Sequence, residues 1–350
     1  MRVSSLADDL LEPNDEVFRA RNASLSEEVG RLRKVVKEQQ ANIDRLERIA
    51  EYSGRSLHVP KWILRVPKKD RHVATICANL SDTHYDEVVN PSEMSGQNAY
   101  DRDIAVMRTE AFFTGIVKLA RHHWAGTDYD GVCLFLTGDI LSGIIHEELD
   151  ATNTAPVLES VLFWAGQIAA GIQMLADEFG AVHVPCVVGN HARQDRKPRA
   201  KEYVRRNFEW LLYQLLAQQF DKDERVTFAI TDDIEQPVDV HGARFVQYHG
   251  MAGGGQGIGG IFPPLMRLVA KLHNRWGAFT AMAYGHYHQN LYAPEQGLLG
   301  NGALKGYDEF ARWMHFRPER PSQMVWLVTP EHGCTWNAPV FVADQKREGW

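Results

Sequence analysis

Five short polar motifs, each placed directly after an apolar run, constrain this chain more than any other feature. The most informative is Gly189-Asn190-His191, which follows the apolar run 182–188 and is therefore expected at the end of a buried strand. Alone, this tripeptide is weak evidence, because Gly and Asn are common turn residues and a single His is more often structural than catalytic. Four further motifs of the same kind strengthen the prediction.

These four motifs also stand at the ends of predicted strands. They are Asp82-Thr83-His84 after residues 73–80, Gly138-Asp139 after 132–136, His249-Gly250 after 245–248, and Gly285-His286-Tyr287-His288 after 279–284. Open α/β sheets hold their ligands at the carboxyl ends of their strands, so we expect all five motifs to converge on one edge. Side chains two residues apart on an extended segment face the same way. The spacing therefore allows Asp82 and His84, and likewise His286 and His288, to point into one site.

The order D-x-H, G-D, G-N-H, H-G and G-H-x-H resembles that of the calcineurin-like metallophosphoesterase superfamily over residues 72–290. Residues 196–201 and 300–309 add a looser resemblance to phage- and prophage-encoded members that are similar to SbcD-type DNA-repair exonucleases. The resemblance implies an α/β fold, specifically a calcineurin-like four-layer α/β/β/α sandwich of two packed mixed sheets flanked by helices.

The resemblance also implies a role for each motif residue. It assigns one metal ion to Asp82, His84 and His288, a second to Asn190, His249 and His286, and the bridging position to Asp139. His191 would hold no metal and would protonate the leaving oxygen or stabilise developing charge. Ala192 and Met251 stand where many relatives carry acidic residues, which weakens any assignment to a subclass.

These residue types suit the hydrolysis of phosphoric esters. The phosphorus is shielded by anionic oxygens and water is a poor nucleophile. Two divalent cations about 3.5–4 Å apart address both obstacles, because they neutralise the phosphate and lower the pKa of a bridging water. Mixed oxygen and imidazole ligands favour Mn²⁺, with Fe, Zn²⁺ or Mg²⁺ as other candidates. We therefore expect a metal-dependent hydrolase.

A basic segment that begins two residues after His191 bears on the substrate. Arg binds phosphate through two hydrogen bonds, although a charged run can equally be a solvated face. The net charge of −7 means that any contact with nucleic acid must come from such a local patch. The candidate substrate-binding residues are Arg193, Arg196, Lys197, Arg199 and, after the second motif, His146, which can also be a surface histidine at a helix start.

Three functions are compatible with these patterns. We expect a nuclease that hydrolyses phosphodiester bonds in DNA, so that nucleic acid is the partner. The first alternative is a phosphomonoesterase, or a small-molecule or cyclic-nucleotide phosphodiesterase, on the same site. The second is a non-catalytic scaffold that uses the fold for assembly.

The chain divides in sequence into residues 1–53, a linker over 54–70 and a metallophosphoesterase domain over 71–350. Within the first segment, apolar residues spaced by four and three predict a helix with a heptad seam. Val or Ile at three a positions and Leu at most d positions favour a two-stranded coiled coil and hence a homodimer. The alternative is a helix packed on its own catalytic domain. The seam consists of Leu25, Val29, Leu32, Val36, Gln39, Ile43, Leu46 and Ala50.

Periodicity predicts helices over residues 104–124, 156–179 and 202–220, and further strands over 226–230, 238–240, 244–248, 324–328 and 340–342. The apolar stretch 158–176 contains Gln167 and Gln173, so we expect a buried helix and no membrane span. The four cysteines show no C-x-x-C spacing and are expected to be buried free thiols. No signal peptide is expected, which favours the cytoplasm of a bacterium or phage-infected host.

Overall fold

The computed structural model describes residues 21, 25–37, 39–40, 60–63, 73–250 and 261–350. The chain forms two units, Met1–Ser56 and Leu57–Trp350, and each is considered by itself. In the first unit residues 25–37 and 39–40 are helical, as the heptad pattern predicts for them. The described apolar seam side chains are exposed, and the seam positions from Ile43 to Ala50 lie outside the described residues.

The second unit contains two mixed β-sheets. The first has the order β11-β10-β1-β2-β3-β4, in which β1 to β4 are parallel and β10 runs antiparallel to both of its neighbours. The parallel part agrees with the strand–helix–strand pattern of the sequence. Its strands are β1 (Val73–Leu80), β2 (Asp128–Thr137), β3 (Val182–Val187), β4 (Val226–Ile230), β10 (Ser322–Thr329) and β11 (Gly333–Phe341).

The second sheet has the order β5-β6-β7-β9-β8. Its central pairs β6–β7 and β7–β9 are parallel, and its outer pairs are antiparallel. The carboxyl ends of β6 and β7 therefore lie at the same edge of this sheet. The strands are β5 (Glu235–Val240), β6 (Ala243–Tyr248), β7 (Ala281–Tyr284), β8 (Leu291–Ala293) and β9 (Leu298–Gly300).

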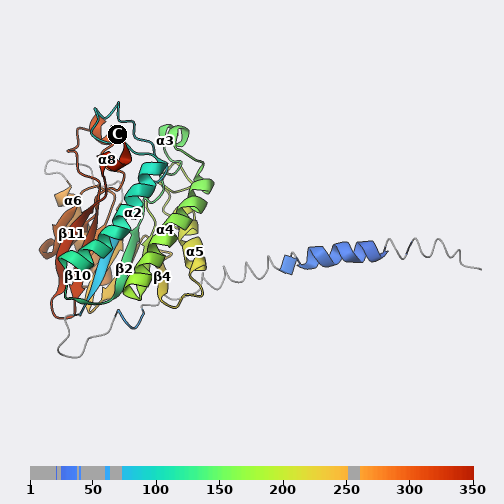
Figure 1. The fold of residues 1–350 in the computed structure, drawn as a ribbon, viewed down its shortest axis with the longest axis horizontal. Helices are drawn as coiled ribbons and strands as arrows, with labels where there is room; N and C mark the ends of the chain where they lie inside the picture. Colours follow the sequence, from blue (N-terminus) through green and yellow to red (C-terminus); the bar gives the residue numbers. More distant parts are fainter. Residues whose placement is uncertain (1–20, 22–24, 38, 41–59, 64–72, 251–260) are drawn as a thin grey trace, which may run out of the picture. The chain divides into compact units, whose positions relative to one another are not determined.

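Helices cover the outer faces of the two sheets (Figure 1). The first sheet is covered by α2 (Arg102–Lys118), which a π-helical turn extends to His123, by α4 (Val157–Phe179) and by α5 (Phe208–Gln219). The second sheet is covered by α6 (Phe262–Trp276). Two shorter helices, α3 (Glu147–Thr152) and α7 (Glu309–Trp313), lie in connections, and α8 (Gln345–Glu348) follows the last strand.

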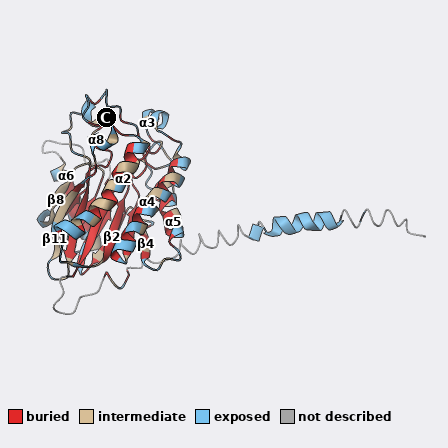
Figure 2. Cartoon of the chain, in the orientation of Figure 1, coloured by how far each residue is buried: buried red, intermediate tan, exposed pale blue. Residues whose placement is uncertain are grey.

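Three apolar clusters hold these layers together. On β1, Ile76 faces the helix-covered cluster while its neighbour Cys77 faces the cluster between the sheets, as strand alternation requires. On β6, Phe245 and Val246 divide in the same way between the inter-sheet cluster and the cluster under α6. The central strands are accordingly buried, the edge strands β8 and β11 are partly exposed, and the outer sides of the helices are exposed (Figure 2). The expected α/β class, with two mixed sheets and flanking helices, is confirmed.

Several local expectations are corrected. The helix predicted over residues 202–220 begins only at Phe208, because Asn207 is extended and its side chain caps the helix by accepting a hydrogen bond from the Glu209 N–H. Helix α6 was not predicted from the sequence, where the whole region appeared β-rich. Ile63, in the segment expected to be a linker, is fully buried in the inter-sheet cluster.

Two further expectations concern this core: that the cysteines are buried free thiols, and that the apolar stretch 158–176 is a buried helix. All four cysteines are free, and Cys77, Cys133 and Cys186 are buried as predicted, whereas Cys334 on β11 is only partly buried. Among the described residues, α4 alone has the length and composition of a membrane span, which by itself is weak evidence. Its buried face, including Trp164 and Ile168, packs in the helix-covered cluster.

Candidate metal centre

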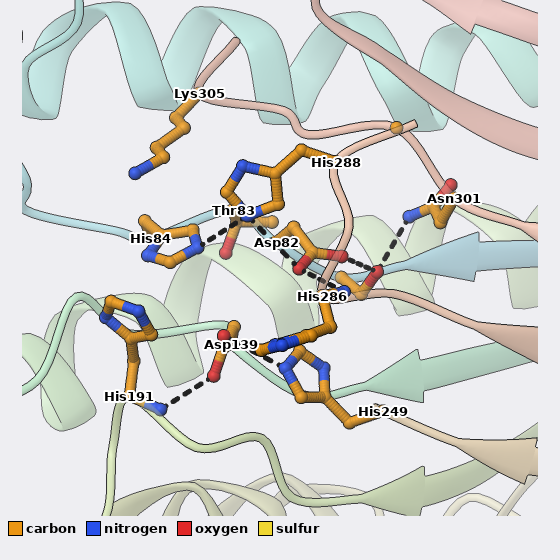
Figure 3. A network of polar contacts seen from close by, with 12 residues as sticks. Asp82, Thr83, His84, Asp139, His191, His249, His286, His288, Asn301 and Lys305 are labelled. Carbon is orange, nitrogen blue, oxygen red and sulfur yellow. Dashed lines mark hydrogen bonds and ion pairs between the residues drawn. The ribbon is translucent and has the colours of Figure 1, made fainter. Parts of the chain in front are cut away.

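The motif residues lie in loops that leave the carboxyl ends of five strands. β1, β2 and β3 of the first sheet carry the D-x-H, G-D and G-N-H motifs, and β6 and β7 of the second sheet carry H-G and G-H-x-H. Because the two sheets pack face to face, these ends meet (Figure 3, in which Asn190 is not labelled). The structure brings all eight predicted metal-site and catalytic residues together. They are Asp82, His84, Asp139, Asn190, His191, His249, His286 and His288.

One triad of possible metal ligands consists of Asp82, His84 and His288, whose ligand atoms all lie within 4.8 Å of one another. His84 Nε2 is 3.2 Å from His288 Nε2, and His288 Nε2 is 3.4 Å from Asp82 Oδ1. Asp82 is fixed by the His286 backbone N–H, which donates to Oδ1 at 2.7 Å, and by Ser81 Oγ, which donates to Oδ2 at 2.5 Å. Three donor atoms thus face one point.

A second triad consists of Asp139, His249 and His286, again with ligand atoms within 4.8 Å. His249 Nε2 lies 2.9 Å from Asp139 Oδ2 and 3.2 Å from Asn190 Oδ1. The second carboxylate oxygen of Asp139 accepts a hydrogen bond from the His191 backbone N–H at 2.8 Å. Asp139 also shares a cluster with His84 of the first triad, so it lies between the two groups.

The donor set fits divalent transition-metal ions. Burial is the largest cause that lowers the pKa of His84 well below its usual value, and it lowers the pKa of His286 to about 4, so both imidazoles are neutral donors. His249 Nδ1 donates to the Thr137 carbonyl at 2.7 Å, which directs Nε2 into the site, as outer hydrogen bonds do for metal-binding histidines. Burial would lower the pKa of His249, but Asp139 raises it to about 10.

The backbone of the site is unusual. Five of its residues adopt positive φ angles although none is glycine: 52° at Asp82, 45° at His84, 48° at Asp139, 70° at His286 and 55° at His288. Such conformations are uncommon for residues with a Cβ atom and concentrate at functional sites, where surrounding contacts hold them. The loops therefore keep a strained shape that aims these side chains inward.

Two motif glycines permit the loops to approach closely. A Cβ atom on Gly189 would lie 2.2 Å from Asp139 Oδ1, and one on Gly285 would lie 2.3 Å from Asp82 Oδ2. A side chain at either position would displace a carboxylate of the site. This close approach gives a physical reason for the glycines that precede Asn190 and His286 in the motifs.

His191 lies beside the first triad. Its ring centroid is 4.4 Å from that of His84, and its Nδ1 donates to the Ser142 carbonyl at 3.2 Å, so Nε2 is the free nitrogen. Burial lowers the pKa of His191 to about 4. His146 is exposed at the start of α3, and its ring centroid lies 5.4 Å from that of His191.

The basic residues after His191 lie close to the site, but most contact other protein groups. Arg193 donates to three backbone carbonyls, those of Asn190, Asp195 and Arg196. Arg196 pairs with Glu147, and Arg199 lies 3.6 Å from Asp195. Lys197 is exposed. The segment is therefore largely neutralised internally.

Two supporting groups were not found from the sequence. Buried Glu209 accepts hydrogen bonds from the backbone N–H groups of Ile140 and Gly189, both at 2.7 Å, and so ties the Asp139 loop to the Asn190 loop. Burial, followed by the charge of Asp139, raises the pKa of Glu209 to about 8. A glutamate inside a helix predicted over residues 202–220 gave no sequence signal for this role.

The second group is a buried ion-pair network behind His84. Lys305 Nζ lies 2.7 Å from Glu87 and 2.6 Å from Asp308, and Glu87 lies 3.4 Å from His84 Nδ1. These residues fall in the stretches 86–103 and 300–309, which the sequence did not connect. They position the loop that carries His84.

Comparisons with known proteins assign neither family nor function. No protein-family model matches the chain. No curated protein matches it. Among solved structures, the protein of unknown function AQ665 from Aquifex aeolicus is similar at 14% sequence identity and a TM-score of 0.26, covering 70% of this chain and 94% of that one. A similarity at this level supports no argument.

Proposed function

We propose that this chain is a phosphoesterase of the calcineurin-like metallophosphoesterase superfamily that uses two divalent metal ions, Mn²⁺ foremost, to hydrolyse phosphodiester bonds in DNA. The observation that carries the proposal is the meeting of two ligand triads around Asp139. The donors come from five strand ends that are far apart in sequence, and buried carboxylates such as Asp82 and Asp139 are costly unless a cation lies against them.

The proposed ligands are Asp82, His84 and His288 for one metal and Asn190, His249 and His286 for the other, with Asp139 shared. Bound divalent cations would neutralise the phosphate oxygens and lower the pKa of a water molecule. Among the chain's own groups, Glu209 and the Lys305 network hold the ligand loops in place before substrate binds. This preorganisation limits the rearrangement needed during reaction.

His191 is proposed to act on the leaving oxygen. Its Nδ1–H is committed to the Ser142 carbonyl, so only Nε2 can exchange a proton with substrate. The imidazole is neutral in the absence of substrate. A bound phosphate brings negative charge, which favours the protonated form of a nearby histidine, so binding would prepare His191 to donate.

The proposal is tested with end-labelled single- and double-stranded DNA incubated with Mn²⁺, beside a nitrophenyl phosphate monoester. Asp139→Asn is the control, because it keeps the size of the side chain and removes its charge. Manganese-dependent shortening of DNA that disappears in the variant is the expected result. Intact DNA together with rapid hydrolysis of the monoester would contradict the nuclease activity and indicate a phosphomonoesterase.

A further inference from the structure

Residues 309–320, which the site described above does not use, place exposed aromatic and basic side chains next to one another. They comprise α7 and the irregular stretch that leads to β10. Trp313 is 74% exposed and Phe310 57% exposed, and their ring centroids lie 6.3 Å apart. Met314 is exposed beside them. Large apolar side chains gathered on a surface commonly mark a binding site.

The exposed charges of this segment are positive. Arg312, Arg317 and Arg320 all lie at the surface. The two acidic residues are engaged elsewhere: Glu309 accepts a hydrogen bond from the Asn90 N–H at 2.8 Å, and Glu319 accepts one from the Asn290 N–H at 3.2 Å. The surface around the aromatic rings therefore suits an anionic ligand.

The three arginines differ in how far other protein groups already contact their guanidinium groups. Arg320 stacks over the Phe341 ring, with its Cζ 4.0 Å from the ring centroid, and Arg312 donates a hydrogen bond to the backbone carbonyl of Glu93. A guanidinium has five N–H donors, so Arg312 retains donors for a phosphate. Arg317 is exposed near Glu319. Arg312 and Arg317 are accordingly the two that can contact a ligand.

Both ends of the segment are fixed to the loops of the metal centre. Asp308, which caps α7, pairs with Lys305, and Lys305 in turn pairs with Glu87 beside His84. Figure 3 shows Lys305 next to His84 and His288. At the other end Glu319 binds the backbone N–H of Asn290, two residues after His288. A ligand on the segment would thus lie next to the metal centre.

We propose that residues 309–320 bind a single-stranded stretch of the DNA substrate, with bases stacked on Trp313 and Phe310 and phosphates held by Arg312 and Arg317. The inference rests on the proposed function and adds that the DNA substrate is bound in single-stranded form. Aromatic side chains stack on bases whose faces are uncovered, as in single strands, while arginines follow the backbone. The basic residues after His191 are less suited, since most are already paired.

The test measures binding without cleavage. Fluorescence anisotropy of a labelled single-stranded oligodeoxynucleotide is recorded with Ca²⁺ in place of Mn²⁺. Trp313→Ala and Phe310→Ala are each expected to weaken binding about 5- to 150-fold, the range for one stacked base. Both side chains are exposed, so their removal does not threaten folding.

Trp336→Ala is the matched control. Trp336 is 59% exposed on β11, where it pairs with Leu327 of β10. Leu327 in turn pairs with Ile76 in the middle of β1, away from the carboxyl end of that strand, where the metal centre lies. The Trp336→Ala variant is expected to bind the labelled single strand as tightly as the wild type does. The inference is overturned if Trp313→Ala binds the strand normally, if blunt duplex binds as tightly as single strand, or if Trp313→Ala changes the sedimenting mass instead of binding.

A small diester without bases, bis(nitrophenyl) phosphate with Mn²⁺, separates this inference from the proposed function. Hydrolysis of the diester by the wild type, together with normal strand binding by Trp313→Ala, would overturn the binding surface and leave the function standing. No hydrolysis of any phosphoester, together with strand binding that depends on Trp313, would support the binding surface and overturn the function.

Discussion

His84 and His288 turn their Nε2 atoms toward one another at 3.2 Å. Two imidazole nitrogens at this distance repel each other if both carry lone pairs or both carry protons. A shared proton or a shared cation resolves the conflict. Asp82 Oδ1, 3.4 Å from the same His288 nitrogen, adds a negative charge and favours the cation.

His288→Ala is therefore expected to remove one bound metal ion and leave the other. The side chain is 29% exposed, so the substitution has little effect on folding. Metal content after dialysis against Mn²⁺, measured by inductively coupled plasma mass spectrometry, would fall from about two ions to about one per chain. His146→Ala, at an exposed neighbouring histidine outside both triads, is the control, and an unchanged content in His288→Ala would exclude the first triad.

Glu209→Gln is expected to weaken metal binding about 10- to 100-fold. Both oxygens of the Glu209 carboxyl group accept backbone N–H groups, whereas the amide of Gln has one acceptor oxygen and an NH₂ group that cannot accept. Isothermal titration with Mn²⁺ measures the affinity. Excess Mn²⁺ should restore activity, whereas a variant that is only less stable would show unchanged affinity below its unfolding temperature.

Lys305→Met is expected to destabilise the protein by about 3–5 kcal/mol, the usual cost when one partner of a buried ion pair is removed. Glu87 and Asp308 would then be left as buried carboxylates without their cation. Urea unfolding gives the free energy. The double variant Lys305→Met/Glu87→Gln should recover part of the loss, and equal stability of the single variant and the wild type would show that the network is not stabilising.

Acid should weaken the same network through Asp308. Burial alone would raise the pKa of Asp308, but Lys305 brings it below the usual value. A lowered pKa in the folded state contributes stability above the unfolded value of about 4, and this stability is lost as pH falls through the folded pKa. Unfolding free energies from about pH 6 to pH 3 should therefore fall more steeply for the wild type than for Asp308→Asn, which keeps the helix cap.

We propose that the heptad segment of residues 25–50 forms a coiled coil with that of a second copy. Its described seam residues Leu25, Val29, Leu32 and Val36 are 54, 46, 50 and 61% exposed, which is unfavourable for apolar side chains without a partner. Deletion of residues 1–53 is expected to halve the number of protomers per particle, as measured by sedimentation equilibrium. The same number of protomers before and after deletion would contradict pairing through this helix.

The motifs could be predicted from the sequence because they join two local signals, an apolar run and a ligand-type residue at its end. The parallel pairing of β1 with β2 and of β6 with β7 then brings the ligands together. Glu209, Glu87 and Lys305 could not be found in this way. Each acts through contacts between loops distant in sequence, and an isolated charged residue carries no periodic pattern.

The errors in secondary structure have similar causes. Residues 202–207 look helical by apolar spacing, yet the backbone pairing of Arg193 with Asn207 holds this stretch against the G-N-H loop. Helix α6 starts with Phe262-Pro263-Pro264, and the prolines, which suit a first helical turn, were not used as a helix signal.

The central claim is that two metal ions share Asp139. Anomalous diffraction at the manganese absorption edge, from crystals of the wild type grown with Mn²⁺, tests it most directly. The account predicts two anomalous peaks about 3.5–4 Å apart, one among Asp82, His84 and His288 and one among Asn190, His249 and His286. A single peak, or no peak among these residues, would contradict it.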